Sequence, residues 1–139
     1  MKTNALDHAA ALCRQTGFAL LSTADARGTP HLGVAAKLGA AAPGKLTVSE
    51  WFCPGTIENL KSSPRVALTV WDKDADRGYQ MLGTVERMRD VGVLDGYAGI
   101  EERQRLPQVE KELTIKIEKI LLFKKGPHTD SEEQETMSA

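Results

Sequence analysis

The sequence predicts a mainly β fold of the α+β class, an antiparallel six-stranded barrel with a few short helices. Apolar segments typical of strands recur at roughly 8–12-residue spacing, and most are joined by short polar turns. Helical patterns occur only at the start of the chain, in one crossover and before the last strand. This order favours an antiparallel barrel over a parallel α/β sheet.

Length and charge limit the classes of function. The 139 residues suit one domain, which we expect over residues 1–126, followed by a disordered acidic tail over 127–139. A net charge of −1 argues against a nucleic-acid partner, and no apolar run approaches the ~20 residues of a membrane span. Asp7 and His8 stand where a signal peptide needs apolar residues, so we expect a cytoplasmic protein.

The first half of the chain predicts two helices and three strands. Asn4 caps a helix that stops at Gly17, residues 18–23 and 30–37 form a hairpin, and 38–44 form a loop. Residues 45–50 alternate as a third strand. A two-turn helix over 56–63 is predicted to be capped by Thr56, to carry Glu58 in its first turn and to end at Pro64.

The second half predicts three more strands and one helix. Residues 65–72 and 78–88 form strands around a polar turn, with Gly83 at a bulge or a close approach of backbone. Residues 91–104 are predicted to be helical. In the last strand, 112–125, the apolar alternation changes phase near Glu118 and Lys119, which indicates a bulge.

The segment EWFCPGTIENLKSSPRV, residues 50–66, holds the main candidate for chemistry. Cys53 lies near a predicted helix start, but no histidine is close to it in sequence to act as a base, so we expect its thiol to pack. Gly55 and Thr56 begin the predicted helix, whose first N–H groups have no internal partner and can bind phosphate. From the local pattern, a phosphate site and a simple capped helix are equally good interpretations.

The other candidates are weaker. Residues 72–83 resemble the first half of a calcium loop but place Arg77 and Gly83 where glycine and glutamate are required. Two cysteines form no disulfide framework, and the three histidines have no metal-ligand spacing, so no metal site is expected. Only His31, at a strand start, is expected to be able to face a site.

Three segments, taken in order, resemble the FMN-binding split-barrel family, also called pyridoxamine 5'-phosphate oxidase-like. They are FALLSTADARGTPHLGVAAK, KLTVSEWFCPGTIENLKSSPRVALTV and RGYQMLGTVE, the last followed by a helix and a closing strand. The resemblance covers residues 10–124 and is closest to the short members of the family. It implies a homodimeric split β-barrel that binds FMN noncovalently at the subunit interface.

The resemblance also implies a set of cofactor-binding residues. One strand lies along the flavin, the end of the next strand lines it, the helix start holds the phosphate, and a later strand reaches the flavin of the other subunit. The implied residues are Leu32, Gly33, Val34, Ala35, Ala36, Lys37, Ser49, Glu50, Trp51, Gly55, Thr56, Lys61, Arg77 and Gln80.

The chain also departs from the oxidase. The oxidase has Arg-Lys at the phosphate position where this chain has Gly55-Thr56, and the oxidase's substrate-binding C-terminal extension is replaced by the acidic tail. We therefore expect an FMN-dependent oxidoreductase of unknown substrate and unknown catalytic residues, with His31 and Tyr79 as the candidate acid or base. The alternative is a non-enzymatic FMN electron carrier, or a flavin- or haem-binding protein. A deazaflavin ranks lower because few basic residues surround the site.

Overall fold

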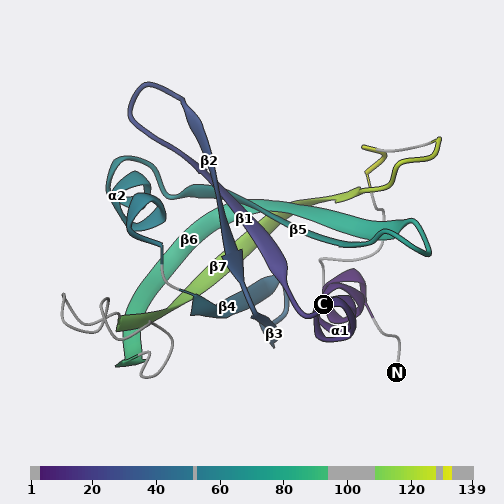
Figure 1. The fold of residues 1–139 in the computed structure, drawn as a ribbon, viewed down its shortest axis with the longest axis horizontal. Coiled ribbons are helices and arrows are strands. Elements are labelled where there is room, and N and C mark those ends of the chain that lie inside the picture. Colours follow the sequence, from purple (N-terminus) through teal and green to yellow (C-terminus); the bar gives the residue numbers. More distant parts are fainter. Residues whose placement is uncertain (1–3, 52, 94–108, 128–129, 133–139) are drawn as a thin grey trace, which may run out of the picture.

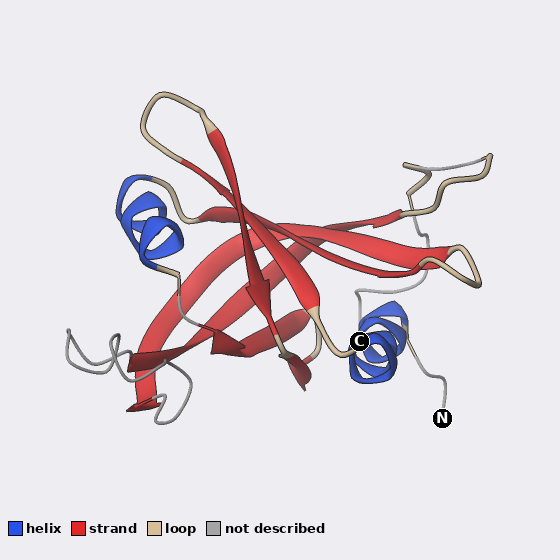
Figure 2. Cartoon of the chain, in the orientation of Figure 1, coloured by secondary structure: helices blue, strands red, loops and turns tan. Residues whose placement is uncertain are grey.

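In a computed structural model, which describes residues 4–51, 53–93, 109–127 and 130–132, the chain forms one antiparallel sheet flanked by two helices (Figures 1 and 2). The strand order across the sheet is β2-β1-β5-β6-β7-β4-β3. The strands are β1 (Ala19–Ala24), β2 (Pro30–Ala35), β3 (Lys37–Ala42), β4 (Lys45–Trp51), β5 (Arg65–Asp72), β6 (Arg77–Val93) and β7 (Val109–Leu122).

The mainly β antiparallel prediction is confirmed, but the strand number is corrected from six to seven. The additional strand is β3, which lies in the segment predicted as a loop, and it pairs with β4 from Lys37 to Ala42. Small residues dominate this segment, so its apolar alternation is weak, and pairing with the neighbouring strand decides its conformation. Within the described ranges the two edge strands, β2 and β3, are not hydrogen-bonded to each other, so the sheet does not close.

Two hairpins lie at opposite ends of the strand order. β1 and β2 pair from Ala19 with Ala35 to Ala24 with Pro30, around a turn in which Gly28 has a positive φ of 85°. The β3–β4 hairpin joins the sheet through β4, which pairs with β7. This arrangement leaves β2 as an edge strand beside α2 (Pro54–Ser62).

The long ribbon of β6 and β7 forms the middle of the sheet. Leu82 pairs with Lys119 and Gly83 pairs with Ile117, so Glu118 is the extra residue of a bulge, as predicted. A Cβ on Gly83 would lie 2.2 Å from the carbonyl oxygen of Lys116, which confirms the close approach of backbone. The helix predicted over 91–104 is wrong for residues 91–93, which belong to β6; the rest of it lies outside the described residues.

The first helix, α1 (Ala5–Thr16), agrees with its sequence signals. The Asp7 N–H donates to Asn4 Oδ1 at 3.0 Å, and Gly17 ends the helix with a left-handed φ of 92°. Its inner face, which includes Leu6, Ala9 and Cys13, is buried in the core with the inward side chains of the sheet. Asp130, Ser131 and Glu132, within the predicted tail, run beside the end of β7, where the Leu122 N–H donates to the Ser131 carbonyl.

No helix in the described part of the chain combines the length and apolar character needed to cross a bilayer.

Candidate functional site

The N-cap of α2 lies three residues earlier than predicted. Cys53 is the N-cap and Pro54 is the first helical residue, so Thr56 is not the cap and Glu58 is not in the first turn. Proline at this position is favoured because its φ already suits a helix and the N–H it lacks would have no partner there. Asn4 caps α1 with its side chain, but Cys53 makes no side-chain hydrogen bond to α2.

The first turn of α2 presents unpaired backbone donors. The first intrahelical bond runs from the Ile57 N–H to the Cys53 carbonyl at 3.1 Å, so the N–H groups of Gly55 and Thr56 precede the helical ladder. The helix dipole adds partial positive charge at the same place. Both N–H groups therefore suit an anion, and the helix that presents them begins earlier than the sequence predicts.

Strand β2 passes directly over this turn. A Cβ on Gly33 would lie 3.1 Å from Thr56 Oγ1 and 3.6 Å from Cys53 Sγ, and a Cβ on Gly55 would lie 2.9 Å from His31 Nε2. The two glycines thus allow the hydroxyl, the thiol and the imidazole to converge between β2 and α2. Asn59 Nδ2 donates to Thr23 Oγ1 at 3.0 Å and fixes the other side of α2 to β1.

Three buried side-chain polar atoms in the described ranges lack a hydrogen-bond partner: His31 Nδ1, Trp51 Nε1 and Thr56 Oγ1. Thr56 is completely buried and Trp51 is 3% exposed. All three belong to β2, the end of β4 or the first turn of α2. Because an unpaired buried polar group costs about 1–3 kcal/mol, such a cluster requires an explanation, and a bound polar ligand is one.

The sequence-predicted residues of β2 to β4 lie in two environments. The side chains of Leu32 and Val34 are exposed on the outer face of β2, whereas Gly33 and Ala35 are buried.

Ala36 and Lys37 are exposed where β2 passes into β3, and Lys37 pairs with Ser49 of β4. Glu50 continues β4. The side chain of Trp51 is buried and packs in the core of the single chain.

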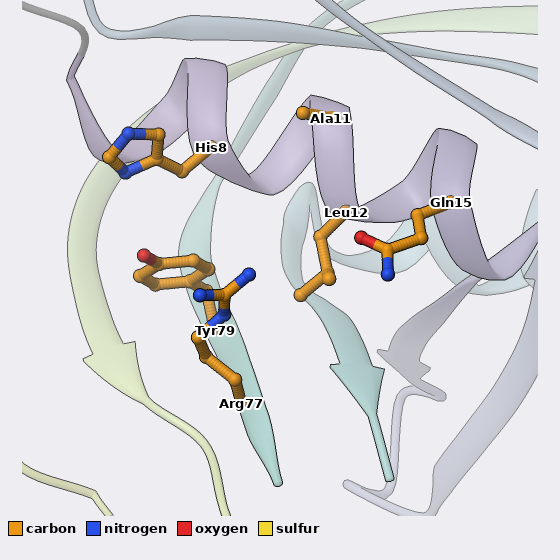
Figure 3. Close-up of a pocket in the computed structure, with 6 residues that line it drawn as sticks. All are labelled: His8, Ala11, Leu12, Gln15, Arg77 and Tyr79. Carbon is orange, nitrogen blue, oxygen red and sulfur yellow. The ribbon is translucent and has the colours of Figure 1, made fainter. Parts of the chain in front are cut away.

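Lys61 and the predicted β6 residues lie away from the start of α2. Lys61 is in the last turn of α2, where its Nζ pairs with Glu58 Oε2 at 2.9 Å on an exposed surface. Arg77 and Tyr79 line a cavity of about 310 Å³ with His8, Leu12 and Gln15 of α1, as Figure 3 shows. Gln80 is on the opposite face of β6 from these two, because side chains alternate along a strand.

The thiol–imidazole pair was missed by sequence reasoning. Cys53 Sγ lies 3.8 Å from His31 Nε2, although His31 precedes it by 22 residues. No local spacing signals this contact, which depends on the packing of β2 against α2. Within the described ranges there is no group of three or more metal-binding side chains.

Comparison with known proteins agrees with this fold. A family model described as pyridoxamine 5'-phosphate oxidase matches residues 5–123. A comparison of the sequence with curated proteins finds no match.

Several solved structures share the fold at low sequence identity. HupZ from Group A Streptococcus is 20% identical with a TM-score of 0.61, over 93% of this chain and 99% of HupZ. An FMN-binding protein from Syntrophomonas wolfei is 19% identical with a TM-score of 0.60, over 84% of each chain. A pyridoxamine 5'-phosphate oxidase-related, FMN-binding protein from Nostoc punctiforme is 11% identical with a TM-score of 0.61, over 92% of this chain and 89% of the other.

Proposed function

Because the chain belongs to the pyridoxamine 5'-phosphate oxidase family, we propose that it is an FMN-binding flavoprotein that acts as an oxidoreductase. The cofactor is held noncovalently, with its phosphate at the first turn of α2. The flavin, when bound, supplies hydride or electron transfer, and the protein supplies binding, orientation and shielding.

The observation that carries this proposal is the unpaired hydrogen-bonding capacity around the start of α2. The N–H groups of Gly55 and Thr56 precede the helical ladder, the side chain of Cys53 makes no capping hydrogen bond, and the buried Thr56 hydroxyl has no partner among the described residues. A phosphate accepts hydrogen bonds from all of these donors and is attracted by the helix dipole. The residues present therefore fit the phosphate of FMN.

The remaining residues suit the ring system of the flavin. The backbone of Leu32–Ala36 lies along one side of the site, and the exposed Lys37 offers positive charge beside Ser49. In our proposal Lys37 stabilises negative charge on the flavin or its phosphate, and Glu50 lies next along β4. Lys61 contributes less to binding the flavin phosphate, because its charge is already paired with Glu58 in the last turn of the helix.

We place the second half of the site on a second copy of the chain. Leu32 and Val34 of the edge strand β2 are 58% and 60% exposed, which is unusual for large aliphatic side chains and suits an interface between subunits. Arg77 lines a cavity beside α1 and Gln80 pairs with Thr69 and Leu121 within the sheet, so in our proposal both approach the other subunit's flavin in a homodimer.

The test is purification followed by a visible spectrum and by titration of the apoprotein with FMN. We expect a flavin absorption spectrum, or uptake of about one FMN per subunit. Haem and deazaflavin, titrated separately, should bind more weakly, and each has a distinct spectrum. If no flavin binds, the proposal is wrong.

Turnover is tested with the loaded protein. An oxidoreductase is expected to be reduced by a nicotinamide or another small donor and to pass the electrons to an acceptor over many cycles. Reversible reduction by dithionite without any catalysed turnover would instead indicate an electron carrier.

A further inference from the structure

The two cysteines of the chain lie in opposite environments. Cys13 is 1% exposed, its S–H donates to the Ala36 carbonyl at 3.8 Å, and burial raises its pKa. Cys53 is only partly buried and is the N-cap of α2, but its side chain makes no hydrogen bond to the helix. Partly exposed thiols beside a helix start and a histidine are typically the reactive ones, whereas buried thiols are inert.

The surroundings of Cys53 are built from two elements. His31 Nε2 of β2 lies 3.8 Å from Cys53 Sγ. The Thr56 hydroxyl and the Cys53 thiol both lie against Gly33, at 3.1 and 3.6 Å from the position that a Cβ on this glycine would take. The Thr56 hydroxyl is completely buried and unpartnered, so it is a second, independent polar group available to an incoming oxygen atom. A Cβ on Gly33 would press on Thr56 Oγ1 and one on Gly55 would press on His31 Nε2, so glycine at both positions is what allows these groups to lie so close together.

We propose that Cys53 and His31 form a thiol site that is reversibly oxidised by hydroperoxides. With the ring proton on Nδ1, His31 Nε2 accepts the proton of the Cys53 thiol. The sulfur then attacks the distal oxygen of the peroxide, the O–O bond breaks, and the proton passes from His31 to the departing oxygen. The sulfur is oxidised to a sulfenic acid, and the hydroperoxide is reduced to an alcohol or to water.

The second thiol that completes the cycle comes from outside the chain. Cys13 contacts Ala36, whereas Cys53 lies against His31 and Gly33, and the three residues of extended backbone from Gly33 to Ala36 span about 10 Å. A disulfide requires Cα atoms within about 7 Å, so the two cysteines do not reach each other. A low-molecular-weight thiol instead condenses with the sulfenic acid, releasing water, and a second such thiol regenerates Cys53.

Oxidation of Cys53 would also weaken the binding of FMN, a consequence that rests on the proposed function. A mixed disulfide on Cys53 would extend from the N-cap of α2, two and three residues before the N–H groups of Gly55 and Thr56. It therefore competes with phosphate for that space. The oxidised protein is expected to bind FMN at least about tenfold more weakly than the reduced protein, the loss expected from one good charge-assisted hydrogen bond.

The thiol reaction is tested on the apoprotein, without flavin. The protein is treated with hydrogen peroxide, its sulfenic acid is trapped with dimedone, and the peptides that contain Cys13 and Cys53 are quantified by mass spectrometry. We expect labelling at Cys53 and not at Cys13, at least about tenfold slower in His31→Gln, because a positioned base typically contributes more than that. His8→Gln, which changes an exposed histidine of α1, is the matched control and should react as the wild type does.

Circular dichroism confirms that each variant is folded before labelling. Equal labelling of the two cysteines, or an unchanged rate in folded His31→Gln, would overturn the inference. FMN titration of the protein carrying a glutathione disulfide, with Cys53→Ala treated in the same way, tests the consequence for the cofactor. If the reduced protein binds no FMN, the proposed function fails while the labelling result still decides the thiol site.

Discussion

At the scale of single residues, Thr56 combines complete burial with an unpaired hydroxyl. We predict that Thr56→Val stabilises the apoprotein by about 1 kcal/mol, because the isosteric methyl group removes an unsatisfied polar atom. The same change should weaken FMN binding by roughly tenfold or more, since a hydrogen bond to a charged phosphate is worth about 1.5–3 kcal/mol. Chemical denaturation of the apoprotein and titration with FMN measure the two effects.

Thr23→Val is the matched control for stability. Thr23 is also buried, but its hydroxyl accepts from Asn59, so its loss should destabilise the protein by about 1–3 kcal/mol. If both threonine variants lose stability, the hydroxyl of Thr56 has a partner within the protein and is not held for a ligand.

Replacing Cys53 by serine is predicted to stabilise the protein and to weaken FMN binding. A serine at this N-cap can accept from the N–H groups of the first turn, so Cys53→Ser should raise the free energy of unfolding by about 0.5–1 kcal/mol. Because the new hydroxyl competes with phosphate for those donors, FMN should bind a few-fold more weakly. Cys53→Ala, which cannot cap, should show neither effect in urea unfolding or FMN titration.

The order of segments predicts which elements form the candidate site, but not how their atoms meet. That order points to β2 and the start of α2, whereas the position of the N-cap depends on Pro54, because proline favours the first helical position. The contact between Cys53 and His31 could not be predicted, because it depends on how an edge strand packs on a helix.

At the scale of elements, Asp76 ties the β5–β6 turn to the segment after β7. Its carboxylate accepts from the N–H groups of Lys125 and Gly126 at 2.7 and 2.9 Å and from Trp71 Nε1 at 3.1 Å. The Lys125 N–H, followed by the Trp71 and Gly126 donors, lowers the pKa of Asp76 below its ordinary value of 3.8.

This lowered pKa makes a prediction about acid stability. A carboxyl group with a lowered folded pKa stabilises the protein fully above its unfolded value, and the contribution is lost as the pH falls below 3.8 through the folded pKa. Asp76→Asn should therefore be less stable than the wild type at pH 7, and the difference should shrink at pH 3. Urea unfolding at both pH values measures this; an equal difference at the two would contradict the ionic role.

The sequence predicted strands best where apolar residues alternate clearly. The phase change at Glu118 located a bulge correctly, because one inserted residue reverses which side chains face the core. The apolar pattern did not predict β3, because its small side chains alternate only weakly. It also did not predict the strand at residues 91–93, where pairing with β7 extends β6.

At the scale of the whole molecule, β2 is an exposed edge. We predict that Leu32→Arg leaves the subunit folded but weakens association of two subunits and reduces FMN uptake, because the charge would be buried at the proposed interface. Analytical ultracentrifugation over a range of concentrations, with FMN titration, measures both. A dimer of unchanged affinity would place the interface elsewhere.

The position of β7 has a consequence for how the chain acquires its structure. The β3–β4 hairpin is attached to the rest of the sheet through β7, which begins some sixty residues later in the chain. During synthesis, the hairpin therefore has no strand to dock on until residues 109–122 leave the ribosome. Such distant pairings fold slowly, so the order of emergence leaves the β4 edge unprotected longest, where a chaperone or an aggregating neighbour would first engage the nascent protein.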